Sequence, residues 1–270
     1  MTGTANRATM FRALHVPGRP LLMPNPWDAG TAKVLASLGF QALATTSSGH
    51  AATLGRLDGS VSRDEVLAHA ASIVDAVDVP VSADLENGFA DDPGAVAATV
   101  RAALGTGLAG CSIEDFTGDP DAPIYDAALA AERVTAAVDA ADSGLVLTAR
   151  AENFIRGNPD LADTIARLQA YQQAGADVLY APGLSSISDI RSVITSVDRP
   201  LNVLVWPGLP PVTDLAAAGV ARVSVGGAFS YVALAALTRA ARELLDHGSY
   251  GFAELVAEGR RQAMTAFDAP

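Results

Sequence analysis

Cysteine and lysine are almost absent from this chain. Cys111 is the only cysteine among its 270 residues, which excludes an internal disulfide and a metal site built from several cysteines of one chain. We interpret Cys111, which lies inside an apolar segment, as a packing residue. Lys33 is the only lysine, and it lies in a segment of helical spacing where a solvated position is expected. Chemistry through a lysine Schiff base is therefore not expected.

Long apolar runs and an excess of positive charge are also missing. No stretch of about 18 uncharged apolar residues occurs, and residues 1–11 lack the apolar core of a signal peptide. The formal net charge is −12, which argues against binding to nucleic acid or to an anionic membrane. We therefore expect a cytoplasmic protein whose partner is a small molecule.

Apolar segments alternate with alanine-rich segments of helical spacing along the whole chain. Eight such β-α units predict a (β/α)8 TIM barrel, as one domain over residues 1–270 with a C-terminal helical extension. A doubly wound sheet is the alternative, but no Gly-x-Gly-x-x-Gly follows the first strand. The expected strands are residues 21–25, 40–45, 79–84, 108–114, 145–151, 178–181, 201–205 and 220–225. The expected helices are residues 28–38, 63–77, 93–106, 126–141, 161–174, 186–196, 212–218, 229–246 and 252–267.

Two carboxylates follow the third expected strand. Asp84 and Glu86 stand at positions i and i+2, so in an extended chain their side chains point to the same side. Two carboxylates at the end of a strand can bind a hard divalent cation. The alternative is a helix cap followed by a solvated loop acid.

Further charged residues follow the neighbouring strands. Glu114 ends the fourth strand and Arg150 ends the fifth, and the carboxyl ends of barrel strands meet at one face. Acids that meet there repel one another unless a cation lies among them. Asp84, Glu86 and Glu114 therefore predict a site for Mg²⁺, or for Mn²⁺, beside Arg150 as a carboxylate-binding group. The alternative is a buried Glu–Arg ion pair that braces the barrel mouth.

A turn rich in hydroxyl and amide groups follows the second strand. It is suited to bind a substrate carboxylate, although an ordinary turn at the start of a helix would look the same. Asn202, at the seventh strand, is a further candidate for substrate binding. His50 is the one histidine expected near the mouth, either as a catalytic group or as a solvated loop residue. The substrate-binding candidates of the turn are Thr45, Thr46, Ser47 and Gly49.

Five motifs in register resemble the isocitrate lyase/phosphoenolpyruvate mutase superfamily. The resemblance covers nearly the whole chain and continues through residues 207–209 and 219–224. The motifs are Asn25-Pro26-Trp27-Asp28, Thr53-Leu54-Gly55 leading to Asp58, Ala83 to Gly88, Ser112-Ile113-Glu114-Asp115 and Thr148-Ala149-Arg150.

This resemblance implies a barrel whose eighth helix is swapped with a partner subunit, in a dimer of dimers. It implies Mg²⁺ at Asp84, with Glu86 and Glu114 binding it directly or through water. Asp58 matches a further active-site acid, Arg150 matches the arginine that holds the substrate, and the turn of residues 45–49 matches the carboxylate cradle. Members of the superfamily make or break C–C or P–C bonds of small 2-oxo or 2-hydroxy acids through an enolate-like intermediate.

The loop after the fourth strand departs from the superfamily. Isocitrate and methylisocitrate lyases carry Lys-Lys-Cys-Gly-His there, whereas residues 116–125 contain no Cys, Lys or His. A lyase that depends on this cysteine is not expected, and an acidic loop should repel a phosphoryl group. Position 86 is also more often Asp in the superfamily, which changes the reach of this carboxylate.

We therefore expect a Mg²⁺-dependent lyase or decarboxylase that acts on a C–C bond of a small 2-oxo or 2-hydroxy dicarboxylic acid. Asp58, His50 and Tyr125 are the candidates for proton transfer. One alternative is a mutase or hydrolase of a P–C or C–O bond. Another is a catalytically idle barrel that binds a metal-chelated metabolite.

Overall fold

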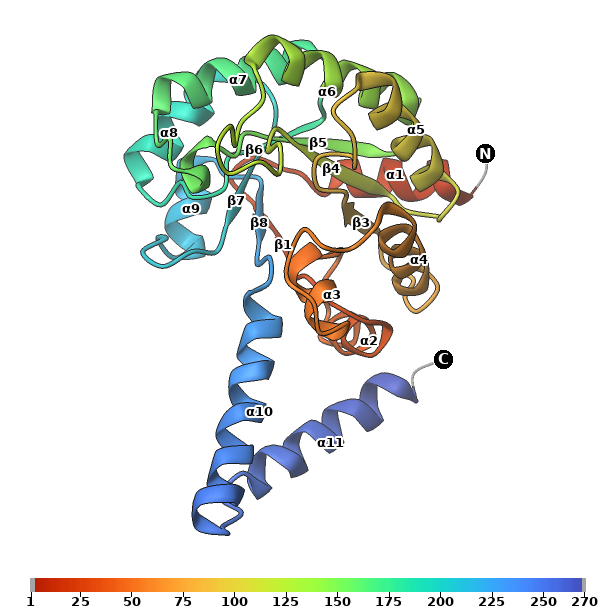
Figure 1. Ribbon diagram of the computed structural model, residues 1–270, viewed down its shortest axis with the longest axis vertical. Helices are drawn as coiled ribbons and strands as arrows, with labels where there is room; N and C mark the ends of the chain where they lie inside the picture. The colour runs from red at the N-terminus through yellow and green to blue at the C-terminus, as the bar shows by residue number, and fades with distance from the viewer. Residues whose placement is uncertain (1–2, 269–270) are drawn as a thin grey trace.

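Eight parallel strands form the body of the protein (Figure 1). The computed structural model describes residues 3–268, so residues 1, 2, 269 and 270 of the predicted domain lie outside it. The strands follow the order β1-β8-β7-β6-β5-β4-β3-β2, which confirms the (β/α)8 barrel. The strands are β1 (Leu21–Met23), β2 (Leu43–Ala44), β3 (Val81–Asp84), β4 (Gly110–Glu114), β5 (Val146–Arg150), β6 (Val178–Tyr180), β7 (Leu201–Leu204) and β8 (Arg222–Ser224).

The two end strands of this order meet through one hydrogen bond. The Ala44 amide of β2 donates to the carbonyl of Pro24, directly after β1, at 3.1 Å. Most strand residues are buried on both faces, as their uninterrupted apolar pattern predicts, whereas Leu22 of β1 is 43% exposed. Cys111 of β4 is fully buried, and burial raises the pKa of its thiol to about 12, which confirms a packing role.

Helices cover the outside of this wall, and α4 to α9 form an arc around the strands in Figure 1. Side-chain caps begin several of them. Asp28 accepts the Thr31 amide at 2.7 Å, and Ser62 forms a reciprocal capping box with Glu65. The helices are α1 (Gly3–Ala13), α2 (Ala29–Ser37), α3 (Ser47–Thr53), α4 (Arg63–Val74), α5 (Pro93–Leu104), α6 (Ala127–Ala141), α7 (Leu161–Gln173), α8 (Ile187–Ser196), α9 (Val212–Ala218), α10 (Ala228–His247) and α11 (Ala253–Phe267), with a 3₁₀ turn η1 (Asn153–Arg156).

Helix α1 was not predicted from the sequence, because it has no continuous apolar stripe. Its last turn lies under the amino-terminal ends of the strands. Phe11 is fully buried there, and a Cβ placed on Gly110 would lie 2.8 Å from the Phe11 ring and 2.7 Å from the Val146 carbonyl. Helix α1 thus closes the bottom of the barrel against the start of β4.

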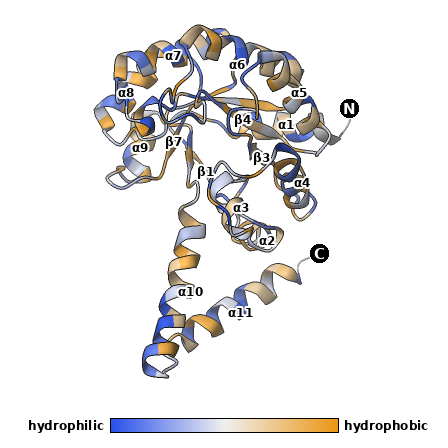
Figure 2. Cartoon of the chain, in the orientation of Figure 1, coloured by the Kyte–Doolittle hydropathy of each residue, from blue (hydrophilic) through white to orange (hydrophobic). Residues whose placement is uncertain are grey.

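Helices α10 and α11 leave the barrel. Helix α10 runs outward from the end of β8, and α11 returns toward α2 (Figure 1). Ser230 is the one buried residue of α10, and hydrophobic residues recur along both helices (Figure 2). The predicted exchange of this helix between subunits, and the single-domain assignment, stay predictions. Within residues 3–268, no helix combines the length and the apolarity that crossing a bilayer requires.

We expect Gly110→Ala to lower the melting temperature by about 3–10 °C, because the added methyl group overpacks the contact with Phe11. Gly259→Ala is the matched control. Nothing lies within 4 Å of its added Cβ on the exposed helix α11, so its melting temperature should stay equal or rise. Equal melting temperatures of Gly110→Ala and the wild type would contradict the packing of α1 under the barrel.

Candidate active site

A cavity of about 430 Å³ opens at the carboxyl ends of the strands. This is the face at which barrel enzymes carry their chemistry. A second cavity of about 440 Å³ adjoins it and shares Ser47, Asp58, Arg150 and Arg156 with the first. Predicted site residues that line the first cavity are Thr45, Thr46, Ser47, Asp58, Asp84, Arg150 and Asn202, and those that line the second are Ser47, Asp58, Glu86, Glu114 and Arg150.

Arg150 lies between the two cavities and binds three carboxylates. Its guanidinium is 3.1 Å from Asp84, 3.1 Å from Glu114 and 2.8 Å from Glu152. The pairing of β3, β4 and β5 brings these groups together, since Glu114 is the register partner of Arg150. Although burial lowers the pKa of a guanidinium, the surrounding carboxylates outweigh it and raise the pKa of Arg150 above its ordinary value. Asp84, Glu114 and Arg150 thus meet as ion pairs, which is the contact expected from the alternative of a buried Glu–Arg pair, and the metal site stays a prediction.

Two acids behind this group were not predicted. Glu152 is fully buried and is also 3.5 Å from Arg156. Asp115 accepts the Glu152 amide at 2.8 Å and the Tyr171 hydroxyl at 2.6 Å, and it pairs with Arg167 at 3.2 Å. These contacts anchor the start of η1 behind Arg150. In the sequence, Glu152 and Asp115 are marked only by their place in the polar residues that follow the fourth and fifth strands.

Asp84 is held in place by hydroxyl groups of neighbouring strands. Its amide donates to Thr45 Oγ1 at 2.9 Å, and Ser112 Oγ donates to its carboxylate at 3.4 Å. Thr45 thus both positions Asp84 through this hydrogen bond and lines the cavity. Thr46 caps α3 through the Gly49 amide at 3.4 Å.

Glu86 has a strained backbone and an uncompensated carboxyl group. Its φ is +49°, in the left-handed region, and its Oε1 is buried with no hydrogen-bond partner among residues 3–268. Burial, Asp84 and Asp58 raise the pKa of this carboxyl to about 7. A buried acceptor that lacks a donor beside two further acids is the arrangement that a cation would stabilise.

The residues fit a divalent cation, although they are not gathered around one point. In the described part of the chain, no three His, Cys, Asp or Glu side chains converge closely enough to hold a metal. Arg150 explains this, because its guanidinium lies between Asp84 and Glu114. The donor set consists of carboxylate oxygens alone, which suits Mg²⁺ better than zinc.

The turn after β2 contributes its first residues to the cavity and not its last. Thr45 to Ser48 line the first cavity, whereas Gly49 packs against Thr46 and Trp27. A Cβ on Gly49 would lie 2.5 Å from Thr46 Cγ2, so the glycine permits close packing of α3. Gly49 does not line the first cavity, so its position does not support the predicted contact with substrate.

His50 lines neither of these cavities. Its ring stacks on His69 with centroids 3.8 Å apart, and His69 Nε2 lies 2.9 Å from the Trp27 carbonyl. Burial, His69 and Arg56 lower the pKa of His50 to about 4. A catalytic role for His50 stays a prediction, and the geometry makes Asp58 the better placed of the two.

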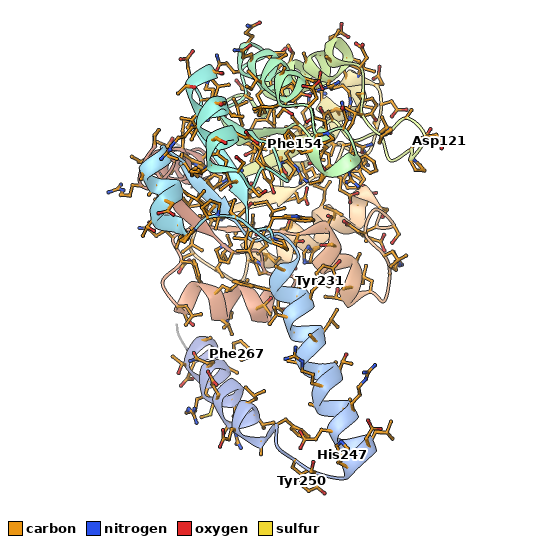
Figure 3. The ribbon with its side chains drawn as sticks, turned by 90° about the vertical axis from the view of Figure 1, so that its left-hand side faces the viewer. Asp121, Phe154, Tyr231, His247, Tyr250 and Phe267 are labelled. Atoms are coloured by element: carbon orange, nitrogen blue, oxygen red, sulfur yellow. The ribbon has the colours of Figure 1, made fainter. Side chains whose placement is uncertain are left out.

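Part of the wall of the first cavity is apolar and aromatic. Ile155, Leu204 and Trp206 line it together with Tyr231, which Figure 3 shows where α10 leaves the barrel. Arg156 lies over the ring of Phe116 at 3.5 Å and lines both cavities. Sequence patterns did not identify Arg156, since it lies at the end of the turn η1 and not at the end of the fifth strand.

The loop of residues 116–125 forms a small hairpin beside the second cavity. Thr117 donates its amide to Pro123 at 2.9 Å, and Asp121 marks the tip of the loop, which projects from the body (Figure 3). Tyr125 closes the hairpin, packs under Arg133 at 3.9 Å and donates to Asp91. Burial and Asp91 raise the pKa of Tyr125 to about 12, and its ring lines neither of the two cavities described above.

Comparison with known proteins adds a family and several relatives. Residues 11–245 match the family model described as phosphoenolpyruvate phosphomutase. An uncharacterized protein of Mycobacterium tuberculosis is 34% identical over 238 residues, which cover 87% of this chain and 89% of that protein. The 2-methylisocitrate lyase of Escherichia coli is 32% identical over 200 residues, which cover 71% of this chain and 67% of that enzyme.

Solved structures are similar over almost the full length. A Burkholderia cenocepacia protein, described provisionally as a lyase or mutase, has a TM-score of 0.95 and 50% identity and covers 100% of this chain and 98% of that one. Oxaloacetate acetylhydrolase, solved with its product oxalate, has a TM-score of 0.81 and 25% identity. This similarity covers 92% of this chain and 89% of that enzyme.

We expect the unfolding free energy in EDTA to fall as pH rises from 4.5 toward 7. The folded state keeps the Glu86 proton over this range, because its pKa is about 7 against 4.5 for an ordinary Glu, and the unfolded state loses it. Glu86→Gln removes this dependence and should be more stable than the wild type at pH 8 by about 2 kcal/mol. Chemical denaturation at several pH values measures both.

The control for this prediction is Glu132→Gln on the exposed side of α6, which should retain the wild-type slope. Addition of Mg²⁺ at pH 8 should stabilise the wild type and Glu132→Gln, and stabilise Glu86→Gln much less. An unchanged pH slope in Glu86→Gln would exclude Glu86 as the uncompensated acid.

Proposed function

This chain belongs to the phosphoenolpyruvate phosphomutase family, a group of lyases and mutases related to the isocitrate lyases, and on that premise we propose that it is a carbon–carbon bond lyase. Its proposed substrate is a small 2-oxo or 2-hydroxy dicarboxylic acid, cleaved through an enolate-like intermediate. Similarity to 2-methylisocitrate lyase and to oxaloacetate acetylhydrolase supports cleavage of a C–C bond.

One observation carries this proposal: Arg150 is fixed by buried carboxylates at the boundary of both cavities. Its guanidinium is charged and preorganised, so it can bind a substrate carboxylate or stabilise negative charge that develops on an enolate oxygen. Thr45, Thr46 and Ser47 line the same cavity and offer hydroxyl donors to a carboxylate. Asp58, which lines both cavities, is the proposed group for proton transfer.

A divalent cation is part of this proposal. We infer that Asp84 and Glu86 would hold Mg²⁺, with Glu114 directly or through water, and Mn²⁺ would suit the same oxygen ligands. The cation supplies Lewis-acid polarisation of the substrate's 2-oxygen. The orphaned Oε1 of Glu86 is the observation that supports a cation there.

The loop of residues 116–125 limits which class of substrate we propose. It carries Asp119 and Asp121 and no cysteine, lysine or histidine, so its own charge disfavours a phosphoryl substrate. The apolar wall of Leu204, Ile155 and Trp206 is compatible with a carbon chain. These features support a carbon acid over a phosphonate.

We expect Arg150→Gln to lower kcat/KM for the accepted oxo acid by about 100- to 1000-fold, since it removes a preorganised positive charge. Arg150→Lys keeps the charge but loses the fork that binds several carboxylates, so it should also lose most activity. Arg63→Gln, on the exposed face of α4, is the control and should retain wild-type turnover. A coupled assay over oxaloacetate, malate-type acids and phosphonopyruvate measures the series.

Three results would contradict the proposal. Wild-type turnover in both Arg150 variants would remove Arg150 from the reaction. Rapid processing of phosphonopyruvate, with oxaloacetate inert, would instead support a mutase or hydrolase of a P–C bond. Tight binding of oxalate with Mg²⁺ and no turnover of any acid would support an idle metabolite-binding barrel.

We also propose that α10 packs on a partner subunit in a dimer of dimers. The helix has 20 residues with Ser230 as its one buried residue, and Leu234, Leu237 and Leu245, which lie on one face, are 44%, 66% and 85% exposed. A helix with such an apolar face is stable when the face is covered. Exchange of α10 between subunits would cover it while the barrel keeps its own β8.

We expect wild-type protein to elute with a mass near four times the 27.5 kDa of one chain. Leu237→Glu should reduce this mass, because a charge cannot be buried unpaired in an apolar interface. Thr135→Glu, on the exposed side of α6, is the control and should keep the wild-type mass. Light scattering after size-exclusion chromatography measures this, and a monomeric wild type would exclude the exchange.

A further inference from the structure

Arg222 of β8 is buried inside the barrel without a carboxylate partner. Arg222 is 2% exposed. Its Nη1 lies 3.2 Å from His15 Nε2, and its Nη2 donates to Thr148 Oγ1 at 3.1 Å. None of the ion pairs formed among residues 3–268 includes Arg222. It thus differs from Arg150, which binds three acids a short way above it.

The partners of Arg222 are neutral. His15 Nδ1 lies 2.8 Å from the Phe11 carbonyl, so we assign the ring hydrogen to Nδ1, and Nε2 accepts from Arg222. Burial and the charge of Arg222 lower the pKa of His15 to about 3, which keeps the ring uncharged. Burial lowers the pKa of Arg222 to about 9, so the guanidinium carries its charge at neutral pH. His15, which sequence patterns placed at the periphery, therefore supports the barrel interior.

The first cavity extends down to Arg222. Barrel interiors are usually filled by bulky branched side chains, whereas the lining of this cavity includes the small residues Ser82, Ala44 and Ser112. Asn202 is the register partner of Arg222 on β7 and also lines the cavity. Small side chains on one side leave space in front of the buried charge.

Two buried polar atoms at this floor lack partners. Neither Arg222 Nε nor Asn202 Oδ1 has a hydrogen-bond partner within the described chain. The other amide atom of Asn202 donates to Ser224 Oγ at 2.9 Å. A rotation of the Asn202 side-chain amide by half a turn exchanges its oxygen and nitrogen positions. The NH₂ group then faces the cavity, and the amide oxygen accepts a hydrogen bond from Ser224 Oγ. Arg222 and Asn202 can then direct two donors at one ligand.

We propose that Arg222 and Asn202 make the floor of the cavity a binding site for one small anion. A buried charge without a counterion is unfavourable, and an anion in the adjoining space would compensate it. The anion comes either from the second carboxylate of the substrate or from a free halide. The first source rests on the proposed function, whereas the second does not.

Thermal denaturation tests the site itself. In halide-free buffer Arg222→Met should melt at or above the wild-type temperature, since it removes an uncompensated charge and keeps the volume. Sodium bromide should raise the wild-type melting temperature by about 5 °C at saturation and leave Arg222→Met unchanged. Malate at one fixed concentration should raise the wild-type melting temperature more than that of Arg222→Met. Arg63→Met, a surface arginine, controls for ionic strength and should respond like the wild type. Equal responses of Arg222→Met and the wild type to both anions overturn the proposal.

Calorimetry with lactate and malate distinguishes the two sources, since these acids differ by one carboxylate. If the substrate supplies the anion, Arg222→Met should weaken malate about 10- to 100-fold and lactate less than twofold. If a halide supplies it, bromide protects only proteins with Arg222, and the ratio of malate to lactate affinity is the same in both proteins. Equal weakening of both acids without bromide protection overturns the site. A wild type that turns over no oxo acid removes the proposed function and leaves the bromide result standing.

Discussion

The barrel mouth depends on the binding of three buried carboxylates by Arg150. Asp84, Glu114 and Glu152 come from the ends of three successive strands, and without a cation they would repel one another in a medium of low dielectric. The positive charge of Arg150 attracts all three carboxylates, and its ion pairs with them fix the orientation of its guanidinium. Asp115 adds a second layer behind it, because it binds both the Glu152 backbone and Tyr171. The active-site charges are therefore held by strand pairing and not by mobile loops.

The charges of the cavity are arranged by depth. The rim carries acids, and among them Glu86 has a buried Oε1 without a hydrogen-bond partner in the described chain and a pKa raised to about 7. A cation would stabilise this carboxylate. The floor carries Arg222, whose neighbours are neutral. A ligand with oxygen atoms at both ends, bound to a cation above and to a guanidinium below, would satisfy both. On the proposed function, this polarity would orient a small dicarboxylate along the barrel axis.

The features that follow from regular periodicity in the sequence were the ones that could be predicted. The alternation of apolar and helical segments predicted the barrel, and the rule that strand ends meet predicted the contact of Asp84, Glu114 and Arg150. Contacts that cross the barrel or its bottom have no local signal. For this reason α1, the pair of His15 and Arg222, and the contacts of Asp115 escaped prediction. The direction of the His50 side chain also has no local signal, because its place in the chain lies near the mouth while its ring stacks on His69.

The hairpin of residues 116–125 has a consequence for how such a barrel diversifies. Its hydrogen bonds close between Thr117 and Pro123 and between Asp115 and Tyr125, so the segment outside them contributes little to the wall. Insertions, deletions and changes of charge at this tip leave the strand ends in place. The hairpin can therefore change in length and charge while the charged residues at the strand ends keep their positions, which is a route by which such a barrel can acquire a different reaction.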